Sequence, residues 1–208
     1  MITFFEWSIW LFYVVLILLT AFILPIKKEN KSYVLFGLGV KILGALFFSL
    51  IFIFYYGFGD SFEYYKGGVE LGKTMYTNPT DYLELLFHES SNNFPVHLRQ
   101  YTDHLAYSDT PEEWFMVKLI SPITNLSFHS YLVLNLFLSL FSFFGSWNLF
   151  KVFKDLFKGK RTLSFIIAFC VPTVLFWGSG LMKDTLTLAF LNYIIYILYN
   201  LFVKKKKE

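Results

Sequence analysis

Charged residues are scarce in this chain, since only 16% of its 208 residues are Asp, Glu, Lys or Arg. The single Cys170 lies inside an apolar run, so no internal disulfide forms and cysteine usage does not indicate a redox compartment. The sequence also lacks a glycine-rich phosphate loop, an HExxH helix, a Cys–His zinc spacing and a nucleophile elbow. No cofactor is therefore predicted, and a divalent metal stays an open alternative.

Hydrophobic residues, in contrast, make up 56% of the chain, with 27 Phe, 14 Tyr and 5 Trp. The core of a soluble domain of this size cannot bury so many aromatic side chains. A segment that crosses the ~30 Å hydrocarbon layer needs about 20 apolar residues. Five segments qualify, at 3–25, 36–57, 129–150, 163–179 and 185–203. The predicted fold class is all-α, a polytopic transmembrane helix bundle of about five spans with one helical extracytoplasmic loop.

Two of these segments have special features. The first lacks the basic start and the small-residue cleavage site of a signal peptide, so it is expected to be retained. The fourth is short and contains Pro172, which removes a helix hydrogen bond and is expected to kink the span.

Basic residues divide the connections between the spans into two classes. Twelve of the 18 Lys and Arg follow the first, third or fifth span. The positive-inside rule makes that side cytoplasmic. The N-terminus is then outside and the C-terminus inside. The predicted divisions are 1–57 with two spans, 58–128 as the extracytoplasmic loop, and 129–208 with three spans and a basic tail. The uneven placement of the +3 net charge gives no reason to expect nucleic acid.

Loop 58–128 contains two helix starts. Asn78 before Pro79 is typical of an N-cap, and predicts a helix through 81–89. Thr110 and Glu113 form a predicted capping box, whose helix is expected to stop near Pro122. This second helix is too short to span. It is expected to lie at the membrane interface, with Trp114 at headgroup depth and the Lys118 amine reaching toward water.

The stretch YYGFGDSFEYYKGG at 55–68 brings a carboxylate to the membrane surface. Gly57 and Gly59 break the helix, and Asp60 follows directly. In a new helix, Asp60, Glu63 and Tyr64 share one face at i, i+3 and i+4. A carboxylate at the lipid boundary is partly desolvated and becomes a stronger general base. The alternative is that Asp60 only caps the next helix, with Glu63 completing a loose capping box.

A second polar stretch, FWGSGLMKDT at 176–185, interrupts the last apolar runs on the same predicted side. Ser179 or Gly180 is expected to end the fourth span, and Asp184 or Thr185 to cap the fifth. Lys183 then sits at a helix N-terminus, where the helix dipole disfavours a cation. An anion shared between the lysine and free backbone N–H groups would explain this position, and a headgroup-level phosphate suits it. The alternative is a Lys183–Asp184 pair that only reaches water.

Lys41 is a charged residue within the second predicted span, so its depth in the membrane has to be explained. It is expected about one turn inside the cytoplasmic end, where its stem reaches the inner headgroups. The nearby glycines would allow close helix packing.

Three stretches carry a resemblance, namely YYGFGDSFEYY, FMVKLISPITNLSFHSYL and PTVLFWGSGLMKDTLTL. They are similar to parts of uncharacterised bacterial polytopic proteins that are grouped with surface-polysaccharide polymerases and glycosyltransferases. The chain also resembles the N-terminal part of a GT-C-type glycosyltransferase, which uses a polyprenyl-phosphate-linked sugar. In that class an early aspartate of the first large external loop is the catalytic base or binds the acceptor. Members of the similar group are longer, so the chain is expected to be an N-terminal portion or a shortened relative.

Asp60, Glu63 and Tyr64 match the position and order of the acids and the Tyr in that class, and the polar groups expected at the same interface add Arg99, Lys183 and Asp184. Asp60 and Glu63 would be catalytic, while Tyr64, Arg99, Lys183 and Asp184 would bind substrate. The expected partners are membrane lipid, a lipid-linked sugar donor and a further membrane protein. The alternative function is a non-catalytic membrane subunit or scaffold of a cell-envelope assembly or export complex. A transporter is disfavoured, because apart from Lys41 the notable polar groups inside the spans are only Asn135, Asn192 and hydroxyls.

Overall fold

The computed structural model describes residues 3–91 and 94–204. The prediction of an all-α fold is confirmed, because no strand occurs within these residues. The elements in chain order are α1 (Phe4–Ile23), α2 (Lys28–Ile51), the π-helical turn η1 (Phe52–Tyr56), α3 (Asp60–Thr77), α4 (Pro79–Phe87), α5 (Val96–Thr102), α6 (Pro111–Leu126), α7 (Tyr131–Leu156), α8 (Arg161–Phe169), α9 (Pro172–Trp177), α10 (Lys183–Tyr199) and the π-helical turn η2 (Asn200–Lys204).

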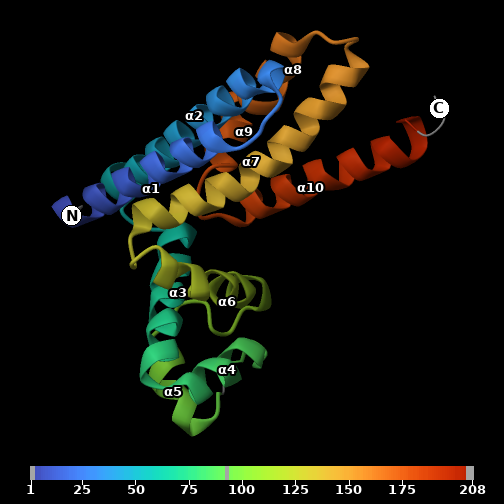
Figure 1. The fold of residues 1–208 in the computed structure, drawn as a ribbon. Helices are drawn as coiled ribbons and strands as arrows, with labels where there is room; N and C mark the ends of the chain where they lie inside the picture. Colours follow the sequence, from blue (N-terminus) through green and yellow to red (C-terminus); the bar gives the residue numbers. More distant parts are fainter. Residues whose placement is uncertain (1–2, 92–93, 205–208) are drawn as a thin grey trace.

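The helices form two parts, shown in Figure 1. One is a bundle of long helices, and the other is a smaller helical domain (α3–α6) at one end of it. Four helices of the bundle are long and apolar enough to cross a membrane, at 4–23, 28–56, 131–156 and 183–203. This arrangement is compatible with a multi-pass membrane protein. We call the end of the bundle next to α3–α6 the domain end, and the opposite end, where α7 and α10 finish, the basic end.

The fourth predicted span is not one continuous helix. The chain breaks at 170–171, and Pro172 is the first residue of α9, so the kink expected there is a full interruption between two short helices. Neither α8 nor α9 is long enough to cross a membrane alone. Together they carry the chain back from the basic end, so that α10 starts near the domain end (Figure 1).

The segment after α9 is buried inside the bundle. Residues 178–181 are all buried, although their backbone is not helical. Lys41 is only 1% exposed and its Nζ donates to Gly178 O and to Ser142 Oγ, both at 2.9 Å. The expected position of Lys41 near the cytoplasmic headgroups is therefore wrong. The helix starts at Lys28, eight residues before the predicted span, so Lys41 lies halfway along it.

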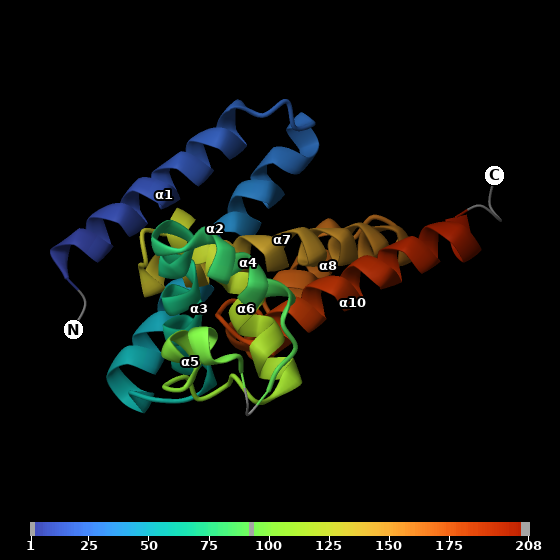
Figure 2. The ribbon, with the colours of Figure 1, turned by 90° about the horizontal axis from the view of Figure 1, so that it is seen from below.

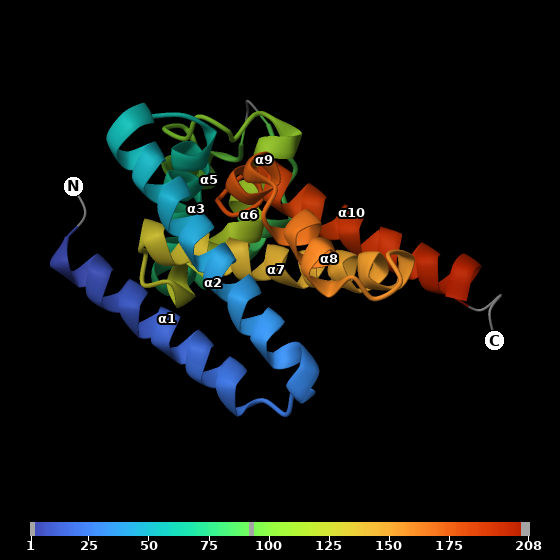
Figure 3. The same ribbon diagram turned by 90° about the horizontal axis from the view of Figure 1, so that it is seen from above.

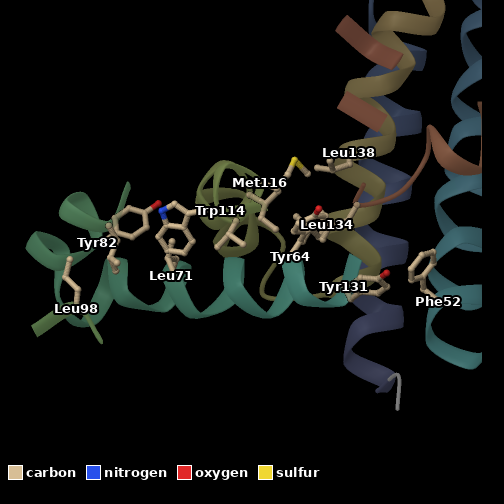
Figure 4. Close-up of a cluster of buried hydrophobic side chains, with 14 of the residues drawn as sticks. Phe52, Tyr64, Leu71, Tyr82, Leu98, Trp114, Met116, Tyr131, Leu134 and Leu138 are labelled. Carbon is tan, nitrogen blue, oxygen red and sulfur yellow. The ribbon is translucent and has the colours of Figure 1, made fainter. Parts of the chain in front are cut away.

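The apolar core of the helical domain is continuous with that of the bundle, since one cluster of buried side chains runs from Leu98 through Trp114 to Phe52 and Leu138 (Figure 4). The predicted cap of α4 is confirmed, because the Asn78 side chain accepts from Asp81 N. Trp114 and Lys118 depart from the prediction. Trp114 is buried, and both side chains donate to His88 O, at 3.2 and 3.0 Å respectively. The tertiary core therefore takes up side chains that were expected at headgroup depth.

Helix α6 joins the domain to both sides of the bundle. Glu113 in its first turn contacts Lys183 at the start of α10, and Leu126 O at its end accepts from Tyr13 of α1 at 2.6 Å. The helix runs through Pro122 to Leu126, four residues further than predicted. It thus connects the start of α10 with α1 at the domain end of the bundle. Figure 2 shows the domain helices from this end.

Helix α1 is the least embedded of the long helices. It lies at the edge of the bundle in Figures 2 and 3, and only Ala21 among its residues is buried. The exposed residues are mostly apolar, as expected for a helix whose outer faces contact lipid.

A substitution at Gly145 tests how closely α7 packs on α10. A Cβ at this position would lie 2.7 Å from Ala189 Cα and 2.8 Å from Ala189 O, backbone atoms that cannot move without shifting α10. We expect Gly145→Ala to lower the free energy of unfolding in detergent by about 1–3 kcal/mol. Gly39→Ala is the control, since nothing lies within 4 Å of its Cβ, and it should be neutral or slightly stabilising. Equal effects of the two changes would contradict the close contact.

Candidate functional site

The site begins where η1 ends and α3 starts. Gly57 and Gly59 have φ values of 70° and 111°, in the region that favours glycine, and they turn the chain out of the bundle. The predicted break is therefore confirmed. Gly59 occupies the N-cap position and Asp60 is the first helical residue, without a capping hydrogen bond from its side chain. The alternative interpretation of Asp60 as the cap is wrong, and its carboxylate is left for other contacts.

Asp60 is held by a tyrosine from the loop between α5 and α6. Tyr107 Oη donates to Asp60 Oδ1 at 2.6 Å. Burial, followed by the hydrogen bond to Asp60, raises the pKa of the Tyr107 hydroxyl, so that it stays a proton donor at neutral pH. Asp60 itself is exposed, and the protein alone does not produce the desolvation expected at this position.

Lys183 comes to the same region from the second half of the chain. It is the first residue of α10, and its Nζ lies 2.7 Å from Glu113 Oε1 in the first turn of α6. The Lys183 hydrogen bond lowers the pKa of the Glu113 carboxyl. Met182 is the N-cap of α10, so the expected capping by Asp184 or Thr185 is wrong. Lys183 pairs with Glu113, whereas the sequence alternative was a pair with Asp184.

Tyr64 lies between these two pairs. Its side chain is fully buried, and its ring centroid is 5.3 Å from that of Tyr107. Its hydroxyl has no hydrogen-bond partner among the residues that the structure describes. Burial first, and then the charges of Asp60, Glu113 and Asp184, raise the Tyr64 pKa. A buried hydroxyl without a partner is energetically costly.

The Asp60–Tyr107 pair and the Lys183–Glu113 pair belong to one electrostatic cluster. The charge of Asp60 reaches Tyr64 and, as the weakest of several influences, Lys183, although no hydrogen bond or ion pair joins Asp60 to Lys183. This cluster joins α3, the loop before α6, α6 and α10. It brings together four of the six predicted site residues, namely Asp60, Tyr64, Lys183 and Asp184.

An apolar groove opens beside Lys183. It lies between α6 and α10 and has a volume of about 540 Å³. Its lining is Pro111, Glu112, Phe115, Met116, Leu119, Lys183, Leu186, Thr187 and Phe190. Lys183 is the only cation among them, and most of the others are apolar. The groove therefore offers a mostly apolar surface with one anion, Glu112, and one cation, Lys183.

The other two predicted residues lie apart from the cluster or serve another contact. Glu63 pairs with Lys66 at 2.6 Å, one turn along α3. Arg99 is on α5, and its Nε donates to Phe94 O at 2.9 Å. In Figure 4 the adjacent Leu98 lies at the end of the domain core farthest from Phe52, with Tyr64 between them. Arg99 is thus not brought to Lys183.

Tyr107 and Glu113 are site residues that the sequence did not reveal as such. Glu113 was predicted as half of a capping box, but the Thr110 side chain makes no cap hydrogen bond. Tyr107 carries no local signal, because its contact with Asp60 spans 47 residues.

Within residues 3–91 and 94–204, no group of three or more His, Cys, Asp or Glu side chains has a geometry suited to a metal ion. No protein-family model matches the chain, and no curated protein or solved structure is detectably similar to it. The site is therefore interpreted from its geometry.

Tyr64→Phe tests whether the hydroxyl is kept for a ligand. Removing a buried unpartnered hydroxyl should raise the free energy of unfolding of the ligand-free protein by about 1–3 kcal/mol. Tyr82→Phe is the matched control, since the Tyr82 hydroxyl is buried but lies 3.1 Å from Ser121 Oγ, and its loss should be destabilising by about 1 kcal/mol. Both are measured by equilibrium unfolding in detergent. A loss of stability in Tyr64→Phe like that in Tyr82→Phe would refute the unpartnered state.

The Glu113–Lys183 pair predicts a pH dependence of stability. The folded pKa of Glu113 lies below its ordinary value of 4.5, so the pair stabilises the fold above about that pH. This contribution is lost as the pH falls through the lower, folded pKa. Thermal unfolding from pH 7 down to pH 3 should show a smaller decline for Glu113→Gln than for the parent protein. Glu112→Gln, on the adjacent exposed residue, should decline like the parent.

Proposed function

We propose that this protein is a glycosyltransferase-like membrane enzyme acting on a lipid-phosphate-linked sugar at the outer face of a bacterial inner membrane. The observation that supports this most directly is that hydrogen bonds hold Asp60 to Tyr107 and Lys183 to Glu113, and that Tyr64, whose ring packs on Tyr107, lies in the field of Asp60 and Glu113. A base, a cation and an open hydrogen-bonding group are the parts that transfer from a phosphate leaving group requires.

Each member of the cluster has a distinct role in this proposal. Asp60, oriented by Tyr107, removes the proton from the acceptor hydroxyl as the new glycosidic bond forms. Lys183 balances the negative charge that grows on the leaving phosphate when the old bond breaks. Tyr64 hydrogen-bonds a sugar hydroxyl or the phosphate. Asp184, exposed on the next residue of α10, lies on the side where a sugar would be bound.

The groove between α6 and α10 suits the lipid part of such a donor. It is mainly apolar along Phe115, Leu119 and Phe190, and Lys183 is at its charged border. A polyprenyl chain in this groove would have its phosphate beside the lysine. Glu113, which now holds Lys183, would be displaced by the phosphate or would orient the lysine toward it.

The same proposal requires an orientation in the membrane. We place the N-terminus and α3–α6 outside and the C-terminus inside. The positive-inside rule supports this, because twelve of the 18 basic residues follow the predicted spans 3–25, 129–150 and 185–203. Figure 1 is consistent with it, since N and C mark opposite ends of the bundle.

A non-catalytic membrane subunit is the second candidate. The observation that favours it is the Lys183–Glu113 ion pair, because it neutralises the cation that the enzyme needs. In this case the α3–α6 domain would bind a protein partner of a cell-envelope assembly, and Asp60 would be dispensable.

Turnover of radiolabelled lipid-linked sugar in membranes separates the two candidates. We expect Asp60→Asn to lower turnover by roughly 10²–10⁴-fold, the usual contribution of a general base. Lys183→Ala should lower it by roughly 10²–10³-fold. Asp103→Asn and Lys73→Ala carry the same charge changes on exposed residues outside the cluster and should retain full activity. Parental rates in correctly inserted Asp60→Asn protein, or stoichiometric crosslinking to one protein partner without turnover, would favour the subunit.

A further inference from the structure

A second cavity lies at the basic end of the bundle, away from the site described above. It is formed where α7 and α10 end, has a volume of about 150 Å³ and is mostly polar. Its lining consists of Lys151, Val152, Lys154, Asp155, Tyr196, Tyr199 and Asn200. At about 30 Å³ per water molecule in the liquid, the space is large enough for a phosphate group.

The lysines of this cavity have no carboxylate partner. Neither Lys151 nor Lys154 forms an ion pair within the part of the chain that the structure describes. Lys151 Nζ lies over the Tyr196 ring, 4.1 Å from its centroid, which fixes the amine at the seam between the helices. Asp155 is the single acid in the lining, so two cations against one anion leave the cavity net positive. It therefore attracts an anion.

An apolar groove continues from this cavity along the same two helices. Its volume is about 390 Å³, and its lining is Phe141, Phe144, Gly145, Asn148, Ala189, Phe190 and Tyr193. Asn148 and Tyr193 precede Lys151 and Tyr196 by three residues, which is about one turn in each helix. The groove thus leads from the polar cavity toward the middle of the bundle.

A polar, positively charged cavity next to an apolar groove is complementary to an amphiphile, which has a polar headgroup and an apolar chain. Its depth fits this too, because Lys151 and Asn200 lie in the last turns of membrane-length helices, where headgroups of that leaflet are found. A free phosphate would fill only the cavity and leave the groove without an occupant.

We propose that the seam between α7 and α10 at the basic end binds an anionic phospholipid. Its phosphate lies between Lys151 and Lys154, with Asn200 and Tyr199 as hydrogen-bonding neighbours, and one acyl chain lies in the groove along Phe141, Phe144 and Phe190. The headgroup cavity of this site shares no residue with the proposed transferase site, and the two grooves share only Phe190.

Native mass spectrometry of the full chain, released from nanodiscs of phosphatidylcholine containing phosphatidylglycerol, tests this site. Phosphatidylglycerol should be retained preferentially. Each lysine near a lipid surface contributes about fivefold, so Lys151→Gln with Lys154→Gln should weaken retention by roughly 25-fold. The matched control is Lys158→Gln with Lys160→Gln, which removes the same charge from the same end but outside the cavity. An equal loss in both double variants would overturn the site in favour of general attraction to the surface.

Three further measurements test the ligand class. Asp155→Asn should strengthen phosphatidylglycerol retention, because it removes the only opposing charge. If it instead abolishes retention, and phosphatidylethanolamine is preferred, the assignment to an anionic lipid is wrong.

Asn148→Phe, which fills the groove, should weaken retention of the lipid while the melting temperature stays unchanged. Competition by inorganic phosphate or glycerol phosphate as effective as that by the lipid would show a small-anion site and overturn the lipid assignment.

Discussion

The structure depends on how the bundle satisfies a stretch of non-helical backbone buried among its helices. Hydrocarbon offers no hydrogen bonds, so irregular backbone at membrane depth persists only where protein groups replace water. Here Lys41 donates to Gly178 O, and Asn135 Oδ1 accepts from Leu181 N at 2.6 Å. Thr185 Oγ1 donates to Gly180 O at 2.6 Å. These side chains from α2, α7 and α10 replace the helical hydrogen bonds that the segment lacks.

Close approach of the helices makes this arrangement possible. A Cβ on Gly180 would lie 2.2 Å from the Phe48 ring, and one on Gly44 would lie 2.7 Å from Ser179 Oγ. The small residues of 176–185 thus bring the segment against α2, and the segment in turn fixes the start of α10. Packing in the middle of the bundle therefore helps to place Lys183 next to Glu113, in addition to the contacts at the surface of the protein.

Hydropathy and local capping signals were enough to predict the fold class, the long helices, the cap at Asn78 and the break at Pro172. The predicted depth of Lys41 was wrong because α2 starts eight residues before the predicted span. This start of the helix is polar, and hydropathy alone cannot locate the end of a helix among charged residues. The pairing of Asp60 with Tyr107 was missed for another reason. It joins residues far apart in the chain, and no periodicity reports which loop folds back onto a helix start.

The candidate site was predictable only in part for similar reasons. Charge placement put Asp60 and Lys183 on one side of the membrane, and the structure brings them into one cluster. Arg99 was predicted on the same side of the membrane as Lys183, but it lies on α5, away from the cluster. Residues on the same side of a membrane need not be neighbours in the folded domain. Glu113 fitted a local capping pattern, yet its carboxylate forms a stronger charge-assisted contact with Lys183 than with backbone N–H groups.

The interruption between α8 and α9 has a consequence for the biogenesis of the protein. The segment from Arg161 to Leu181 lacks a complete set of internal hydrogen bonds, so it is a poor candidate for stable insertion on its own. Its partners belong to α2 and α7, which are synthesised earlier, and to α10, which is synthesised later. Stable placement of this segment therefore depends on contacts with its neighbours, including α10, which is synthesised after it.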